Sequence, residues 1–158
     1  MSETTETAKQ GLGAGLRTVM KFALTMHCRL YRVSNGRFGG KVRGAPVLLL
    51  TTTGRKTGQP RTWPVAYLAD GADLIIIASA GGQPRHPAWY LNLRATPQVT
   101  VQVGARTQPM VARVTAGDER AQLWARVVRA YPAFAGYERK TTRQIPVVVL
   151  HAESAAPG

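Results

Sequence analysis

Two cations, Arg55 and Lys56, stand in a short turn between two strand-like segments. Residues 47–53 are rich in apolar and β-branched types and end in three threonines, and a second such segment covers 61–69. A glycine at each end of the turn allows the positive φ angles of tight connections. Arginine offers a planar fork, lysine a point charge, and turn amides add donors. The turn therefore predicts a phosphate site, although a solvated basic hairpin has the same pattern, and the GxxxxGK[ST] spacing of a P-loop is absent.

The charge distribution also favours an anionic ligand. The 158-residue chain carries 21 Lys and Arg against 8 Asp and Glu, a net charge of +13, and no acid occurs between Glu6 and Asp70. Such a field attracts nucleic acid, an acidic membrane surface, or a phosphorylated or carboxylated cofactor. The length indicates one domain, and the hydrophobic content of 44% argues against disorder.

Other kinds of site have little support. The single cysteine, Cys28, excludes a disulfide framework and fits a reducing cytosol. The histidines are scattered, so no metal site is predicted, and no Ser–His–Asp set or carboxylate pair stands out. The sequence shows neither a signal peptide nor an apolar run of transmembrane length, so we expect a cytoplasmic protein. A chain poor in acid–base groups predicts that a bound cofactor carries the reaction.

Hydrophobic periodicity predicts the elements that position the turn. We expect flexible tails at 1–10 and 152–158, an amphipathic helix at 11–33, and a cofactor-binding domain at 34–151. Short strands are expected at 47–53, 61–69, 74–79, 98–103, 107–115 and 145–150, helices at 88–95 and from 118 to Pro132, and a loop at 133–144. Pro64 suggests that its strand lies at an edge or a bulge. The pattern favours a small, six-stranded antiparallel barrel of the mainly β (α+β) class, whose filled core would leave a cofactor in an outer groove or at a dimer interface.

The N-terminal helix allows two interpretations. Its apolar positions recur at helical spacing, and Arg17, Lys21, Arg29 and Arg32 add positive charge. It either packs on the domain or lies as a basic amphipathic helix on an anionic bilayer, for which we expect weak, salt-sensitive contact at the inner face of the membrane.

Five sequence blocks carry a family resemblance: LLLTTTGRKTGQPR, DGADLIIIAS, PAWYLNLRATPQVTVQV, DERAQLWARVVRAYP and IPVVVL. In order and spacing they resemble the deazaflavin (coenzyme F420)-dependent nitroreductase family, actinobacterial reductases that include a nitroimidazole-activating enzyme, over most of residues 36–151. The resemblance implies a split β-barrel and an oxidoreductase in which reduced coenzyme F420 donates a hydride to a small-molecule acceptor: a quinone, an activated alkene or a nitroaromatic. The phosphate and oligoglutamate tail of this cofactor are polyanionic, which agrees with the basic turn.

The resemblance also implies site residues. The cofactor-binding positions are the phosphate and tail grip (Arg55, Lys56, Thr57), the strand along the cofactor (Arg61, Thr62, Trp63, Pro64, Val65, Ala66), the strand end beside the ring (Ile77, Ala78, Ser79, Ala80) and the closing helix (Ala88, Trp89, Tyr90, Leu91, Asn92). Tyr131, Phe134 and Tyr137 match the substrate side and are the catalytic candidates. The nitroimidazole-activating member has a lysine at the position of Ala80, which Arg85 would replace, and a tyrosine at that of Phe134. Without that hydroxyl, we expect quinone or enone reduction to exceed nitroimidazole reduction.

Two other functions are compatible with the residues. FMN also presents a phosphate, so an FMN-dependent reductase on a similar barrel is the first alternative. The second is a basic nucleic-acid-binding module, which net charge alone supports and which predicts steeply salt-dependent binding. We expect no nucleic-acid partner, and the sequence does not predict the oligomeric state.

Overall fold

The fold combines antiparallel strands with a helix at the start of the chain and helices between the strands. The computed structural model describes residues 3–153 and the side chains of residues 15–153. In chain order the elements are α1 (Glu3–Ser34), β1 (Lys41–Val42), β2 (Ala45–Thr53), β3 (Pro60–Asp70), β4 (Asp73–Ile77), η1 (Ala80–Gly82), α2 (Ala88–Ala95), β5 (Gln98–Val103), β6 (Arg106–Val114), α3 (Gly117–Ala130), η2 (Pro132–Phe134), α4 (Ala135–Arg139) and β7 (Val147–Ala152).

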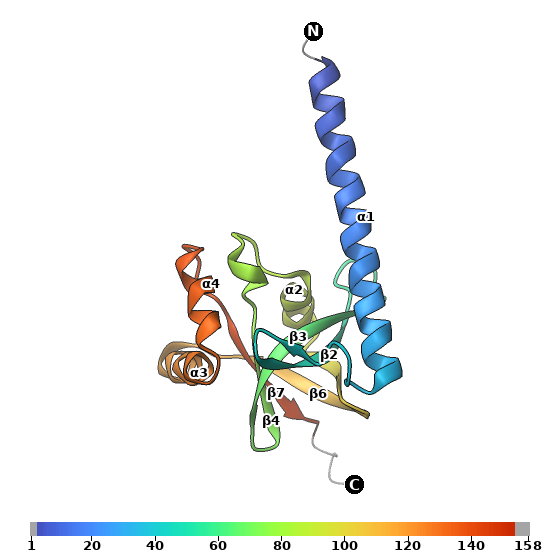
Figure 1. Ribbon diagram of the computed structural model, residues 1–158. Helices are drawn as coiled ribbons and strands as arrows, with labels where there is room; N and C mark the ends of the chain where they lie inside the picture. The colour runs from blue at the N-terminus through green and yellow to red at the C-terminus, as the bar shows by residue number, and fades with distance from the viewer. Residues whose placement is uncertain (1–2, 154–158) are drawn as a thin grey trace.

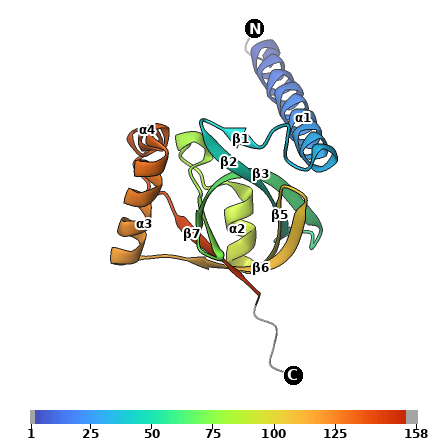
Figure 2. The same ribbon diagram turned by 60° about the horizontal axis from the view of Figure 1, so that its bottom comes forward.

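Six of the strands close into a barrel. The strand order is β2-β3-β4-β7-β6-β5, and pairing of β2 with β5 completes the ring, which confirms the predicted six-stranded antiparallel split barrel. The two-residue β1 adds a short hairpin to β2 that was not predicted. Figure 2 looks along the barrel, with α2 lying across its mouth. Helices α3 and α4 lie on the opposite side of the barrel from α1 (Figure 1).

Two apolar cores hold these layers together. The first fills the barrel and includes Trp89, Tyr90 and Leu93 of α2, so this helix closes one end. The second lies between the outside of the barrel and the helices α3, η2 and α4. Strand β4 contributes to both cores, because Ile76 faces the first while Ile75 and Ile77 face the second. This strand is therefore buried on both faces.

Helix α1 contacts the barrel near its C-terminal end. Cys28 and Tyr31 are buried against Val47 and Leu49 of β2, and the Tyr31 hydroxyl accepts a hydrogen bond of 2.9 Å from Gly104 N–H. The rest of the helix projects beyond the barrel (Figure 1). No helix among the described residues is long and apolar enough to cross a membrane.

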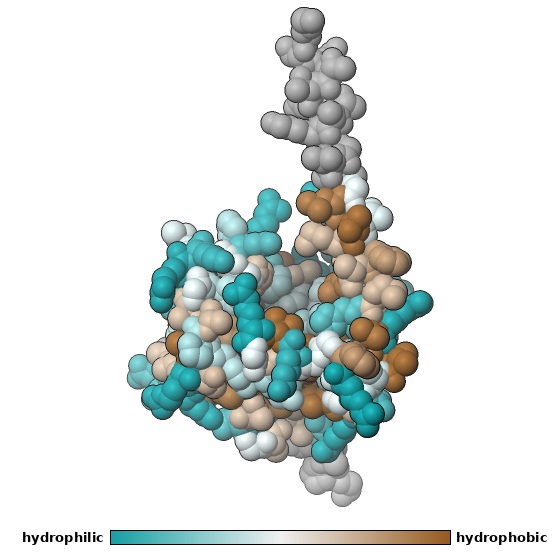
Figure 3. Space-filling view, in the orientation of Figure 1, coloured by the Kyte–Doolittle hydropathy of each residue, from teal (hydrophilic) through white to brown (hydrophobic). Residues whose placement is uncertain are grey.

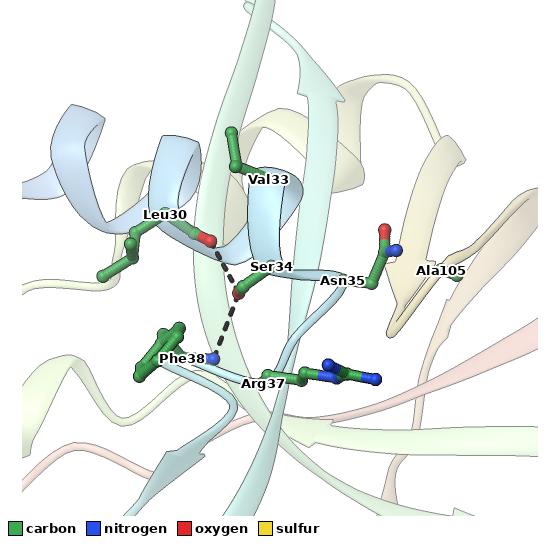
Figure 4. Close-up of a pocket in the computed structure, with 7 residues that line it drawn as sticks. All are labelled: Leu30, Val33, Ser34, Asn35, Arg37, Phe38 and Ala105. Carbon is green, nitrogen blue, oxygen red and sulfur yellow. Dashed lines mark hydrogen bonds between the residues drawn. The ribbon is translucent and has the colours of Figure 1, made fainter.

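The turn after α1 borders a cavity of about 680 Å³. Ser34 Oγ donates to Leu30 O at 2.7 Å and accepts from Phe38 N–H at 3.1 Å, which turns the chain back towards the barrel (Figure 4). Leu30, Val33 and Phe38 line this cavity with apolar side chains that remain exposed to solvent. The apolar surface of α1 thus continues past the end of the helix.

Several predicted boundaries differ from the structure. Helix α1 begins at Glu3 rather than near residue 11, because hydrogen-bonded turns propagate through its weak glycine positions. The expected loop at 133–144 contains η2 and α4, which are too short to show a periodic pattern. The final strand is shifted to Val147–Ala152. Of the two expected tails, residues 1–2 and 154–158 lie outside the described residues, and strand β7 includes Ala152.

Candidate functional site

Two glycines shape the basic turn between β2 and β3. Gly58 N–H donates to Gly54 O at 2.7 Å, and Gly54 N–H donates to Gln59 O at 2.8 Å. Gly58 has a φ of +70°, as a tight turn requires. Gly54 does not share this conformation; a Cβ there would lie 2.9 Å from Thr57 Oγ1 and 3.0 Å from Gln59 O. The prediction of a positive φ was right for Gly58 and wrong for Gly54. A glycine is needed at position 54 because a side chain there would collide with Thr57 and Gln59.

Asn92 of α2 anchors the turn to the barrel. Its Oδ1 accepts hydrogen bonds from Arg55 N–H at 3.2 Å and Arg55 Nη1 at 3.5 Å, while its Nδ2 donates to Thr52 Oγ1 at 3.1 Å. Asn92 is 3% exposed and Thr52 is 2% exposed, so water does not replace these contacts. The Asn92 side-chain amide therefore holds both the backbone and the guanidinium of Arg55 in place.

A cavity of about 220 Å³ opens beside the turn. Its lining combines glycine, cations, an aromatic ring and the start of α2: Gly54, Arg55, Lys56, Thr57, Arg61, Trp63, Ala88 and Asn92. We call it the basic-turn pocket. No acidic residue lines it, and within the described part of the chain no carboxylate forms an ion pair with Arg55, Lys56 or Arg61. The positive charge is therefore available to an anion, which fits the phosphate site predicted from the sequence.

The strand beside this pocket has a free edge. Residues 60–66 of β3 pair with β2, and pairing with β4 begins only at Tyr67. Along 60–66 no described strand covers the other edge. Helix α1 contacts this edge at Thr62, whose O lies 3.9 Å from Cys28 Sγ, and the backbone beyond Thr62 is open to a ligand. Pro64 lies in this edge segment, which confirms the edge position predicted for it.

The other predicted cofactor residues divide by exposure. Trp63, Thr62, Pro64, Ala66, Ser79, Ala80 and Leu91 are partly exposed, whereas Val65, Ile77, Ala78, Trp89 and Tyr90 are buried in the two cores. The buried side chains shape the barrel behind the pocket.

Arg143, which the sequence did not single out, holds the loop after β4. Its guanidinium donates to Ala78 O at 3.2 Å, Ser79 O at 2.8 Å and Gln83 O at 2.9 Å. The loop has an unusual shape, since Ala80 has a φ of +47° and the next two glycines are also left-handed. Because these contacts join positions about sixty residues apart, no local pattern could have predicted them.

His86 completes this loop. Its Nδ1 lies 3.1 Å from Arg143 Nη1, and its ring lies 4.8 Å from that of Tyr90. Burial, together with the charges of Arg143 and Arg94, lowers the pKa of His86. Burial likewise lowers the pKa of Arg143, but an arginine guanidinium stays protonated in proteins. Nδ1 therefore acts as the acceptor for the arginine, and the neutral imidazole is favoured.

The three catalytic candidates form one aromatic group in the second core. The ring centroids of Tyr131 and Phe134 lie 6.0 Å apart, and those of Phe134 and Tyr137 lie 5.4 Å apart. Phe134 and Tyr137 are 5% and 8% exposed, so they pack inside the protein, and they lie in η2 and α4 rather than in the predicted loop. Tyr131 is partly exposed, and with Phe134 and Ala66 it borders a gap of about 10 Å³. The group thus adjoins β3, but the gap is far smaller than a substrate.

Sequence comparison decides the family. A family model described as F420H(2)-dependent quinone reductase matches residues 23–152. The chain belongs to this family. Its relatives include the F420H(2)-dependent quinone reductase Rv1261c of Mycobacterium tuberculosis, which is 46% identical over 132 residues, or 80% of this chain and 88% of the relative. The quinone reductase match confirms the resemblance inferred from the five sequence blocks.

Two solved structures share the fold of this F420H(2)-dependent quinone reductase family member. A structure described as an F420-H2 dependent reductase (FDR-A) has a TM-score of 0.62 and 42% identity, and the match covers 67% of this chain and 94% of that one. Another, described as a domain-swapped dimer, has a TM-score of 0.64 and 35% identity over 88% of this chain and 98% of that one.

Proposed function

We propose that this chain reduces a quinone with reduced coenzyme F420 as the hydride donor. The family match over residues 23–152 carries the proposal, because it spans the basic turn, the free edge of β3 and the loop held by Arg143. When bound, the cofactor supplies the hydride, and the protein supplies binding, orientation and a dry environment.

The residues present fit this cofactor. Arg55, Lys56 and Arg61 would bind its phosphate, since these three cations line the basic-turn pocket without acidic partners. The free edge of β3 would receive the edge of a planar ring through backbone groups. The loop from Ala78 to Gln83 would hold the ring from the other end, in the shape that Arg143 imposes.

The acceptor would lie near the aromatic group. Tyr131 is the most accessible of the three rings and borders the same gap as Ala66 of the cofactor strand. We therefore assign the acceptor contact to Tyr131, with Phe134 and Tyr137 supporting it from inside the core. Activated alkenes and nitroaromatics are further acceptors that this apolar wall would take, with quinones favoured.

The decisive experiment mixes the protein with reduced F420 and a soluble quinone and follows return of the oxidised cofactor's absorbance. We expect reoxidation well above the rate without enzyme, and a strong loss in Lys56→Ala. Lys41→Ala is the matched control, because Lys41 is also exposed but lies outside the basic-turn pocket. Tight binding of FMN with none of F420 would reverse the assignment.

Helix α1 would bring the enzyme to an anionic membrane. Its side chains Leu16, Val19, Met20, Phe22 and Val33 are each more than 60% exposed, and the helix also carries Arg17 and Lys21. Figure 3 shows apolar surface along the coloured part of this helix. Exposed apolar side chains combined with cations are typical of helices that lie on anionic lipid. Such contact would place the enzyme near quinones dissolved in the bilayer.

Co-sedimentation with anionic vesicles tests this contact. Binding should fall as salt rises, and Val19→Ser with Met20→Ser should abolish it. Val114→Ser, at an exposed position on the barrel, is the control. If wild-type protein stays in solution and self-associates instead, the apolar surface of α1 is a protein interface; one similar solved structure is described as a domain-swapped dimer.

A further inference from the structure

A second basic pocket lies between α1 and the start of β3. It has a volume of about 270 Å³ and is lined by α1 on one side and the strand on the other: Leu24, Thr25, Cys28, Arg29, Arg32, Pro60, Arg61 and Thr62. We call it the helix–strand pocket. Arg61 also lines the basic-turn pocket, so the two cavities meet at this residue.

Side-chain contacts between α1 and β3 shape the helix–strand pocket. Cys28 is 6% exposed, and its Sγ lies 3.9 Å from Thr62 O, which fixes the rotation of α1 against β3. Arg32 Nη2 donates to Thr62 Oγ1 at 3.2 Å, and this hydroxyl also lies 2.8 Å from Thr51 Oγ1. Arg29 is three residues before Arg32 on the helix, so the two side chains project to neighbouring positions.

The charge of the helix–strand pocket is not neutralised by the protein. No acidic residue lines it, and within residues 15–153 none of Arg29, Arg32 and Arg61 forms an ion pair. The described arginines that do pair, Arg113 and Arg126, lie elsewhere. Three guanidinium groups around one cavity form a receptor for carboxylates, because each offers a fork that matches a carboxylate.

We propose that the helix–strand pocket binds the carboxylates of the cofactor's oligoglutamate tail. This inference rests on the proposed function, in which the phosphate occupies the basic-turn pocket. Since Arg61 lines both pockets, a flexible polyanionic chain leaving the phosphate reaches Arg29 and Arg32 without crossing an acidic surface. Helix α1 thereby becomes part of the cofactor site, a role that the sequence pattern alone did not predict.

Binding of F420 forms with different tails tests the proposal. Affinities are measured by calorimetry for a form without glutamates and a form with several. Wild-type protein should bind the long-tailed form about tenfold more tightly, and Arg29→Gln with Arg32→Gln should remove this difference while leaving the affinity for the tail-less form unchanged. Arg17→Gln with Lys21→Gln makes the same charge change on α1 outside the pocket and should keep the difference. Melting curves without cofactor should coincide, because all four side chains are exposed.

Three results would overturn the proposal. The first is equal wild-type affinity for both forms, and the second is an equal loss in both double variants, which would indicate a general field effect. The third is normal tail dependence in Arg29→Gln with Arg32→Gln together with lost binding to anionic vesicles, which would assign the pocket to a lipid headgroup. Failure of the proposed function has a different signature, since neither form would then bind the wild-type protein.

Discussion

Replacing Asn92 with alanine should destabilise the protein and weaken cofactor binding together. The substitution removes the hydrogen bonds to Arg55 N–H at 3.2 Å and to Thr52 Oγ1 at 3.1 Å. The Thr52 hydroxyl is 2% exposed and would lose its side-chain partner. Two lost bonds at roughly 1 kcal/mol each, with the cost of an unpaired buried hydroxyl, give about 2–4 kcal/mol. For a chain of this size that corresponds to a fall of about 5–15 °C in melting temperature.

Thermal melts without cofactor and titrations with F420 measure the two effects. The affinity should fall about tenfold, because Arg55 would no longer be held at the pocket. Lys56→Ala is the informative companion: it should weaken binding by about 1–3 kcal/mol yet leave the melting temperature unchanged, since the side chain is exposed. An Asn92→Ala protein with weaker binding and an unchanged melting temperature would refute the anchoring role and indicate direct contact with the cofactor.

His86, Arg143 and Phe134 give three more predictions. Because the pKa of His86 is lowered in the folded protein, the unfolded chain binds a proton at this residue more readily. The folded protein therefore has its full stability above the ordinary histidine pKa of 6.5 and loses stability as the pH drops below that value. His86→Asn should flatten that part of a plot of melting temperature against pH. Arg143→Gln should lower stability by about 2–4 kcal/mol and expose residues 78–86 to proteolysis, and unchanged cleavage would count against the loop contact. Phe134→Tyr should raise nitroimidazole reduction relative to quinone reduction in paired rate assays, and a constant ratio would remove this ring from substrate choice.

Local patterns were sufficient for much of the fold. Alternation and turn residues located the strands to within a few residues, and Pro87 followed by Thr96-Pro97 predicted α2 at its observed bounds, Ala88–Ala95. The basic turn was also visible, because a glycine-bounded pair of cations is a local feature. Each of these features depends on residues close together in the chain.

The remaining parts of the site depend on contacts between distant residues. Asn92 was expected to touch the cofactor, and only the fold shows that its amide reaches Thr52 and Arg55, about forty residues earlier. Phe134 and Tyr137 were expected in a loop, because the short helices after Pro132 have no periodicity to reveal them. Arg143 resembled any other surface arginine in the sequence. Burial and long-range partners, which composition does not encode, distinguish these residues.

The position of β7 in the barrel has a consequence for synthesis of the protein. This strand comes after all its neighbours in the sequence, yet it lies between β4 and β6, and Arg143 lies four residues before its first residue. A nascent chain emerges from the ribosome N-terminal end first, so the basic turn is present long before the barrel can close. Cofactor capture must therefore wait until nearly the whole chain has been released, and until then β4 and β6 present unpaired edges that a chaperone would have to shield.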